Sequence, residues 1–379
     1  MARPRSFAIG LALGAAGFAM CASATWAQEG PAGLTAPVVL PPFDPAAPSC
    51  SMPTTLQRSL TFLQDNGREF MQGVRAGLAA AAADRGLSFR VDLADNDAAK
   101  MQKDAQAALE RKDGGVVVAP IDPRGMARPL QRIMWAGGYV GAVVPPPATT
   151  ILNAPQYETG KVLAEAAARY ISDKLGERAR VVLLTHDSNQ FLAARFVAMR
   201  DVLSKLSGVT IVADVSPMTV NKAGGFSTMQ TILIAQPNVD VVLGADTVVL
   251  GALEALRQEG KDRPDQFLGG IDGEPEAVAE IRSGGPYKAS VSLASPVFGY
   301  AMGQHAADWL EGKSIPQAMD ILPKALDASN LEQYAADLAN PGAVYADPAR
   351  RGSYLRMYGN ICFDTRDRYL NFPWSSEGR

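Results

Sequence analysis

Residues 239–282, VDVVLGADTVVLGALEALRQEGKDRPDQFLGGIDGEPEAVAEIR, contain two short apolar runs, each followed by a polar turn and a helix-forming segment. The runs 239–243 and 267–271 have the length of strands and are mostly apolar, as expected of strands covered on both faces of a sheet. Residues 247–258 and 274–282 have helical spacing. Strands separated by helices of this length predict a parallel sheet.

The same alternation extends to both sides of this stretch. The strands are too many for one small sheet, and the run Val143–Pro147 (VVPPP) interrupts the pattern near its middle. The sequence therefore predicts an α/β fold of two doubly wound parallel-sheet lobes joined by hinge crossovers, with a cleft at the carboxyl ends of the strands. We assign residues 54–147 plus 294–324 to the N-terminal lobe and residues 148–293 to the C-terminal lobe. Further strands are expected at 59–64, 87–93, 115–119, 139–144, 180–184, 209–215 and 289–293, and further helices at 69–85, 97–111, 124–136, 159–175, 190–206, 223–235 and 297–312.

Both ends of the chain lie outside this alternating pattern. Arg3 and Arg5 precede a short apolar run and small residues, so residues 1–27 predict a signal peptide that is removed on export to the periplasm. Residues 28–53 are rich in Pro, Ala and Gly and predict an extended arm. Residues 325–379 are mostly polar and irregular, and we expect a C-terminal extension that packs on the lobes; a partner-binding role is the alternative.

The chain has three cysteines, of which Cys21 is lost with the signal peptide. Cys50 and Cys362 remain, one in each flanking extension. In an oxidising compartment this pair predicts a disulfide that joins the N-terminal arm to the C-terminal extension, with two buried thiols as the alternative. By restricting the unfolded chain, closing a loop of roughly 300 residues would raise the free energy of unfolding by about 5 kcal/mol.

Composition and motifs argue against several classes of function. The 36 Lys and Arg residues nearly balance the 39 Asp and Glu residues, so a nucleic-acid-binding surface is not expected. The sequence has no phosphate loop, no H-E-x-x-H or C-x-x-C motif and no G-x-S-x-G elbow. His186 stands beside Asp187 and Ser188, but catalytic triads are assembled from separate elements, so it predicts a polar loop residue. We expect no catalytic residues, no cofactor and no metal site.

Two carboxylates stand where a strand gives way to a helix. Asp246 follows the strand at 239–243, and Asp272 follows the strand at 267–271. Either side chain can cap its helix through the first backbone N–H groups, or offer oxygen acceptors to a ligand in the cleft.

Taken together and in this order, the strand–turn–helix segments that contain Asp246 and Asp272 resemble the type I periplasmic solute-binding proteins of ABC importers, the ribose-binding-like, sugar-binding group. Residues 241–260, 270–281 and 289–312 are similar to that family's second-lobe signature and crossover, and the resemblance covers about residues 54–323. It implies two lobes that close on a ligand by hinge bending and a protein that is not an enzyme.

The resemblance also implies where a ligand is bound. Phe70 falls on a stacking-aromatic position, just after a polar loop. Arg195 falls on the family's second-lobe arginine. Leu293 or a neighbour such as Ser292 falls at the crossover strand, where the family often has glutamine. The expected ligand-binding residues are Asn66, Arg68, Phe70, Arg195, Asp246, Asp272 and Ser292.

Several positions depart from the family's pattern. The family often has an Asp-Arg pair at the first crossover, where this chain has VVPPP, and Asn before the helix-opening Asp, where it has Ala245. Each change removes a polar partner for a sugar hydroxyl, so an ordinary aldopentose or hexose fits poorly. A smaller, less polar or anionic ligand fits better, and Arg68 and Arg195 would suit a carboxylate.

The sequence thus predicts an exported, monomeric solute-binding protein without nucleic-acid partners. It would deliver a small polar organic ligand (sugar-like, a polyol or a small acid) to the membrane permease subunits of an ABC importer by lobe closure. The alternative is a sensory module that presents its ligand to a membrane kinase or chemoreceptor.

Overall fold

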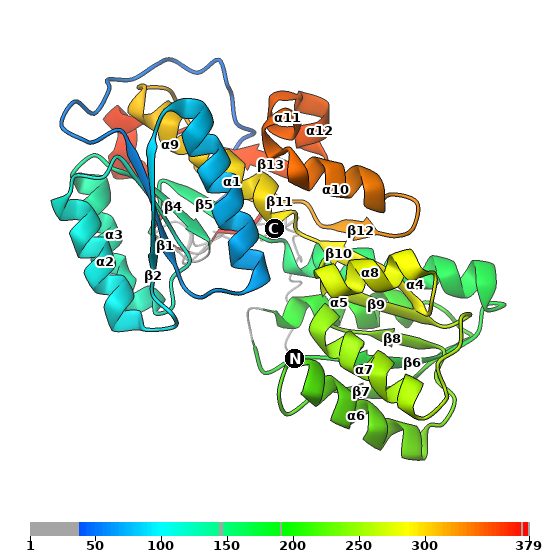
Figure 1. The fold of residues 1–379 in the computed structure, drawn as a ribbon. Coiled ribbons are helices and arrows are strands. Elements are labelled where there is room, and N and C mark those ends of the chain that lie inside the picture. The colour runs from blue at the N-terminus through cyan, green and yellow to red at the C-terminus, as the bar shows by residue number, and fades with distance from the viewer. Residues whose placement is uncertain (1–37, 144–146, 190–191, 373, 378–379) are drawn as a thin grey trace, which may run out of the picture.

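The computed structural model describes residues 38–143, 147–189, 192–372 and 374–377 of the chain. Figure 1 shows these residues folded into two lobes that lie side by side. The predicted signal peptide and the first part of the arm lie outside the described residues. Among the residues described, no helix is both long and apolar enough to cross a membrane.

The N-terminal lobe is built on a seven-stranded sheet in the order β13-β11-β5-β4-β3-β1-β2. Every neighbouring pair is parallel except β11 and β13. One face of this sheet packs against α2 and α3 and the other against α1 and α9. The strands are β1 (Ser59–Gln64), β2 (Ser88–Leu93), β3 (Gly115–Val118), β4 (Tyr139–Val143), β5 (Thr150–Asn153), β11 (Ala318–Ile321) and β13 (Leu355–Tyr358), and the helices are α1 (Glu69–Arg85), α2 (Ala98–Glu110), α3 (Pro123–Trp135) and α9 (Ser295–Leu310).

The C-terminal lobe repeats this plan on a six-stranded sheet in the order β12-β10-β9-β8-β6-β7. Its one antiparallel pair among the described strands is β10 with β12. Helices α4 and α5 cover one face, and α6 and α7 cover the other. The strands are β6 (Ala179–Leu184), β7 (Val209–Val215), β8 (Val241–Leu243), β9 (Phe267–Asp272), β10 (Tyr287–Ser292) and β12 (Lys324–Leu326), and the helices are α4 (Gln156–Lys174), α5 (Ala193–Leu203), α6 (Lys222–Ala235), α7 (Asp246–Gln258) and α8 (Pro275–Ser283).

The prediction of an α/β fold with two doubly wound lobes is confirmed, with an antiparallel strand added at one edge of each sheet. The first sheet runs on to Asn153, beyond the boundary we set at residue 147. The short strand β5 follows the proline run and has only four residues, so its sequence pattern does not distinguish it from a loop.

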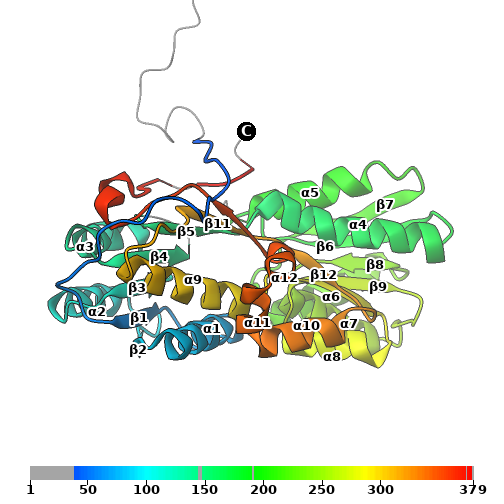
Figure 2. The same ribbon diagram turned by 90° about the horizontal axis from the view of Figure 1, so that it is seen from above.

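Within the described residues, the chain passes from one sheet to the other four times: after β5, after β10, between β11 and β12, and between β12 and β13. The last passage consists of α10 (Leu331–Ala339), α11 (Pro341–Ala346) and α12 (Pro348–Gly352), which lie at the junction of the lobes in Figure 2. The C-terminal extension is therefore built into the fold.

The N-terminal arm covers the outer edge of β13. The amide of Gly359 donates to the carbonyl of Pro41 (2.7 Å), and the amide of Phe43 donates to that of Met357 (3.0 Å). A disulfide joins Cys50 to Cys362, as the sequence predicts, with the two Cα atoms 6.1 Å apart. The arm and the extension thus close the edge of the first sheet together.

Candidate ligand-binding cleft

The candidate site is formed by loops that leave the carboxyl ends of strands in the two lobes. In the N-terminal lobe, β1 ends at Gln64 and a polar loop leads into α1. In the C-terminal lobe, β9 ends at Asp272. The charges of the two loops interact across the junction. The charge of Arg68 lowers the pKa of Asp272, and the charge of Glu69 raises the pKa of Glu274. Ligands of open α/β sheets bind at such strand ends.

Arg195 and Asp272 form the core of the C-terminal wall. A guanidinium nitrogen of Arg195 lies 3.8 Å from a carboxylate oxygen of Asp272. The Nε of Arg195 donates to Oε1 of Gln156, at the start of α4, which fixes the plane of the guanidinium group. Burial lowers the pKa of Arg195, and Asp272 partly opposes this effect. The arrangement places donors and an acceptor next to each other, as a ligand hydroxyl requires.

The loop that carries Asp272 is held in an unusual conformation. Asp272 has φ +120°, a region that residues with a Cβ rarely adopt. The next amide, of Gly273, donates to Oγ of Ser290 (3.0 Å), and the amide of Glu274 donates to Oδ2 of Asp246 (2.8 Å). Burial raises the pKa of Asp272, whereas Arg195 and Arg68 lower it. Its side chain remains 37% exposed, so it can meet a ligand.

Asp246 is placed differently from our expectation of a ligand contact. Its carboxylate is fully buried and accepts hydrogen bonds from Tyr287 Oη (2.7 Å), Ser290 Oγ (2.7 Å) and the amide of Glu274. Burial raises its pKa to about 6, against the effect of these hydrogen bonds. Both carboxylate oxygens are thus engaged within the lobe, where they support the Asp272 loop.

Ser292 also departs from the expected ligand contact. Its hydroxyl is buried, accepts from the amide of Ala294 (3.1 Å) and shares a hydrogen bond with the hydroxyl of Tyr334 on α10. The sequence could not reveal this partner, because Tyr334 lies in the extension, outside the resemblance. Ser292 therefore connects the crossover to the extension.

The N-terminal wall carries Asn66, Arg68 and Phe70. Arg68 is 60% exposed and pairs with Asp65 at 2.9 Å. Oδ1 of Asn66 accepts from the amide of Arg68 (3.1 Å), which holds the loop in a turn. The ring of Phe70, at the start of α1, packs against Phe298 of α9, with centroids 5.7 Å apart.

Gln64 is a polar residue of this region that sequence reasoning missed. It is the last residue of β1, is only 1% exposed, and donates through Nε2 to the carbonyl of Asn66 (2.6 Å). Its Oε1 has no hydrogen-bond partner among the described residues. A glutamine at the carboxyl end of a predicted strand, just before a polar loop, was the available signal.

The charges of the cleft do not favour an anionic ligand. Arg68 pairs with Asp65, and Arg195 lies beside Asp272, so neither cation is left over for a ligand carboxylate. Burial and, to a lesser extent, neighbouring carboxylates, including Glu69 of the other lobe, raise the pKa of Glu274 to about 7. A ligand carboxylate would meet this excess of negative charge. We therefore favour a neutral ligand over an anionic one.

The polar groups around His186 form no reaction centre among the described residues. Asp187, beside His186, pairs with Arg200 at 2.6 Å, so it does not serve as a triad acid. No group of His, Cys, Asp and Glu among the described residues could hold a metal ion.

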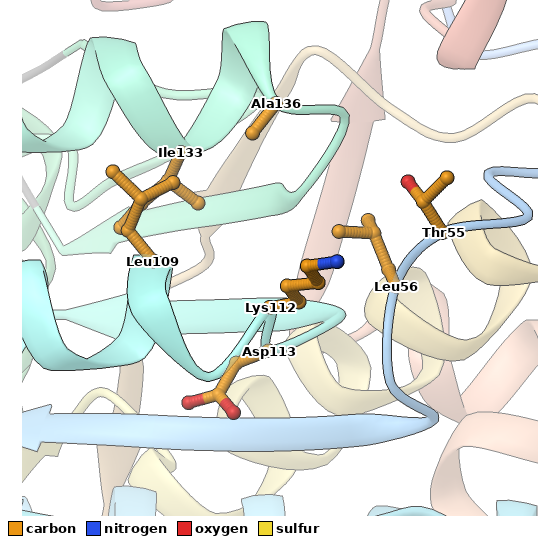
Figure 3. Close-up of a pocket in the computed structure, with 7 residues that line it drawn as sticks. All are labelled: Thr55, Leu56, Leu109, Lys112, Asp113, Ile133 and Ala136. Atoms are coloured by element: carbon orange, nitrogen blue, oxygen red, sulfur yellow. The ribbon is translucent and has the colours of Figure 1, made fainter.

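A partly open pocket of about 370 Å³ lies away from the candidate site, in the N-terminal lobe (Figure 3). Its lining residues precede β1, β3 and β4 or belong to α2 and α3, so it lies at the amino ends of the strands. They are Thr55, Leu56, Leu109, Lys112, Asp113, Ile133 and Ala136.

Known proteins resemble this chain over most of its length. The family model described as a periplasmic binding protein domain matches residues 61–314. The ribose import binding protein of Bacillus subtilis is 25% identical over 66% of this chain and 80% of its own length. The D-apiose import binding protein of Actinobacillus succinogenes is 32% identical over 34% of this chain and 41% of its own. The crystal structure of a periplasmic ribose ABC transporter from Conexibacter woesei superposes with a TM-score of 0.65 at 20% identity, covering 74% of this chain and 95% of that one.

Proposed function

The chain belongs to the periplasmic binding protein family, and we propose that it binds a small neutral sugar or polyol between its lobes and delivers it to an ABC importer. Members of this family bind solutes and are not enzymes, which agrees with the sequence prediction of a protein without catalytic activity. The relatives are named as import binding proteins for ribose and D-apiose, which supports a sugar-like ligand and a role in import.

The observation that carries the proposal is the juxtaposition of Arg195 and Asp272. A hydroxyl group donates one hydrogen bond and accepts others, so the carboxylate and the guanidinium could serve the same or adjacent hydroxyls. Arg68 and Asn66 would add polar contacts from the other lobe. Phe70 would cover an apolar face of the ligand, as aromatic rings do for sugars.

Ligand binding would couple to lobe closure. A ligand that contacts both walls binds the closed form more tightly than the open form, and it shifts the equilibrium between them by that difference. The closed form would then dock on the membrane permease subunits in the periplasm.

Thermal unfolding of the chain without its signal peptide tests this proposal. The ligand panel contains neutral pentoses, hexoses and polyols, with sugar acids of matched size as the comparison. A ligand at roughly 1,000 times its Kd stabilises the folded state by about 4 kcal/mol, which raises Tm by several degrees.

The Asp272→Ala variant is the control, since it lacks the acceptor in the cleft and should show a much smaller shift. The proposal fails if no neutral sugar or polyol raises Tm, or if the wild type and Asp272→Ala respond equally.

A further inference from the structure

Residues 327–354 lie beyond the family match, which ends at residue 314, and they contact both lobes. The segment leaves β12 in the second sheet, forms α10, α11 and α12, and enters β13 in the first sheet. We call α10–α12 the brace. Any rotation of one lobe against the other has to move the brace or break its contacts.

On the side of the C-terminal lobe, α10 makes three contacts. Nδ2 of Asn330 donates to the carbonyl of Ala325 in β12 (2.9 Å), and Glu332 pairs with Arg282 of α8 at 3.1 Å. The third contact is the hydrogen bond between the hydroxyls of Tyr334 and Ser292. Only this last contact is buried, so it contributes more than the exposed ion pair.

On the side of the N-terminal lobe, α11 packs against α9. The ring of Tyr345 lies 5.7 Å from that of Tyr300 and 6.4 Å from that of His305, measured between centroids. The guanidinium of Arg351 covers the Tyr345 ring at 5.1 Å. These contacts attach the brace to the helix that follows the second passage between the lobes.

Asp337 holds α10 and α12 together as one unit. This carboxylate is 3% exposed and accepts hydrogen bonds from Tyr354 Oη (2.5 Å), Arg350 (2.5 Å) and Gln333 (2.7 Å). A buried carboxylate with all its partners in place resists deformation, because breaking one bond leaves a charged group poorly solvated. Asp337 therefore joins α10 and α12 into a single rigid unit.

Tyr334 touches the chain at the point where it changes lobe. Ser292 is the last residue of β10, and α9 of the other lobe begins at Ser295. Ala294, between them, has φ +45°, and its amide donates to the hydroxyl of Ser292. A change of lobe angle requires rotation about such backbone bonds.

We infer that Tyr334 is a positioning residue for lobe movement: through Ser292 it fixes the second crossover, and the brace thereby sets the ratio of open to closed lobes. This inference rests on the lobe closure of the proposed function, but it concerns the chain without ligand. It gives the C-terminal extension a role in tuning affinity, since a ligand's apparent Kd depends on the population of the competent form.

The test measures the distance between the lobes in the ligand-free protein with its disulfide intact. Spin labels are attached at Lys103 on α2 and Ile234 on α6, two exposed positions, through an unnatural amino acid that leaves the cysteines untouched. Loss of the hydroxyl in Tyr334→Phe should change the ratio of open to closed populations roughly fivefold, the equivalent of one hydrogen bond of about 1 kcal/mol.

Tyr170→Phe is the matched control, because the hydroxyl of Tyr170 on α4 donates to the carbonyl of Asp265 within the C-terminal lobe (3.2 Å). It should leave the distance distribution unchanged. Ser292→Ala should reproduce the effect of Tyr334→Phe, and the double variant should add nothing to it. Ser292→Ala also provides the readout if Tyr334→Phe fails to fold.

The inference is overturned if Tyr334→Phe or Ser292→Ala folds and gives the wild-type distribution, or if Tyr170→Phe changes the distribution as much. These outcomes do not depend on the ligand panel. If no compound of the panel bound, the proposed function would fail, whereas the effect of Tyr334→Phe on the lobe distance would still hold.

Discussion

The two walls of the cleft differ in how firmly their polar groups are held. In the C-terminal wall, Arg195 is 8% exposed. The loop of Asp272 is held by hydrogen bonds from its backbone amides to Asp246 and Ser290. In the N-terminal wall, Arg68 is 60% exposed and its partner Asp65 belongs to the same loop. The C-terminal lobe thus carries a preformed half of the site, and the N-terminal lobe supplies groups that adapt.

This difference suggests the order of events during binding. Groups that are already oriented bind a ligand without a further loss of side-chain entropy. We therefore expect the C-terminal wall to bind the ligand first. Arg68 and Asn66 would then complete the contacts as the lobes close. The following experiments test this difference between the two walls and measure its size.

The largest effect is expected from Asp246→Ala. The variant leaves three donors of the C-terminal lobe without their acceptor, two of them buried, so the free energy of unfolding should fall by at least about 3 kcal/mol. Asp65→Ala in the N-terminal wall should cost about 1 kcal/mol, because its exposed donors can bond to water. Urea unfolding measures both values, and equal losses would contradict the asymmetry.

A smaller effect is expected on affinity when each wall loses its arginine. For any sugar or polyol that raises Tm, Arg195→Gln should weaken binding roughly 100-fold, as expected when a buried charged donor to the ligand is removed. Arg68→Gln should weaken it less than about tenfold, because its side chain is largely solvated. Isothermal titration calorimetry measures both, and the reverse order would place the preformed half in the other lobe.

The pH dependence of stability offers a third, smaller contrast. Burial lowers the pKa of His305 in the N-terminal lobe from 6.5 to about 4, and neither ring nitrogen has a partner among the described residues. The unfolded chain therefore takes up the proton first, and a contribution to stability is lost as the pH falls from 6.5 to 4. Asp246 acts in the opposite sense: its pKa is raised from 3.8 to about 6, so stability is lost as the pH rises through that window.

Thermal unfolding between pH 4 and pH 7 separates the two contributions. His305→Gln should remove part of the acid-side loss of Tm, and Asp246→Asn should remove the opposing slope. An unchanged acid-side slope in His305→Gln would show that the buried imidazole does not control it.

Much of the fold could be predicted because long elements carry a clear pattern. The helix over 69–85 and its end at Gly86, which has φ +62°, follow from helical spacing and a glycine that tolerates this backbone conformation. Strands β5, β11 and β12 have three or four residues and show no usable periodicity. Their place in the sheets depends on pairing with residues far away in sequence.

The candidate site was predictable only in outline. Polar residues at strand ends identified the loops of Arg195 and Asp272, but not the direction of each side chain. Asp246 turns inward because Tyr287 and Ser290 offer it buried donors, and Ser292 turns toward Tyr334. Such partners are set by tertiary packing, which local pattern does not encode.

The central claim is that one neutral, hydroxylated ligand bridges the two walls. Titration calorimetry on the wild type and on the double variant Arg195→Gln/Asp272→Ala, with each sugar or polyol that raises Tm, tests it most directly. The account predicts saturable one-to-one binding to the wild type and a loss of at least about 100-fold in the double variant. Unchanged affinity in a folded double variant would show that the ligand binds elsewhere and would contradict the account.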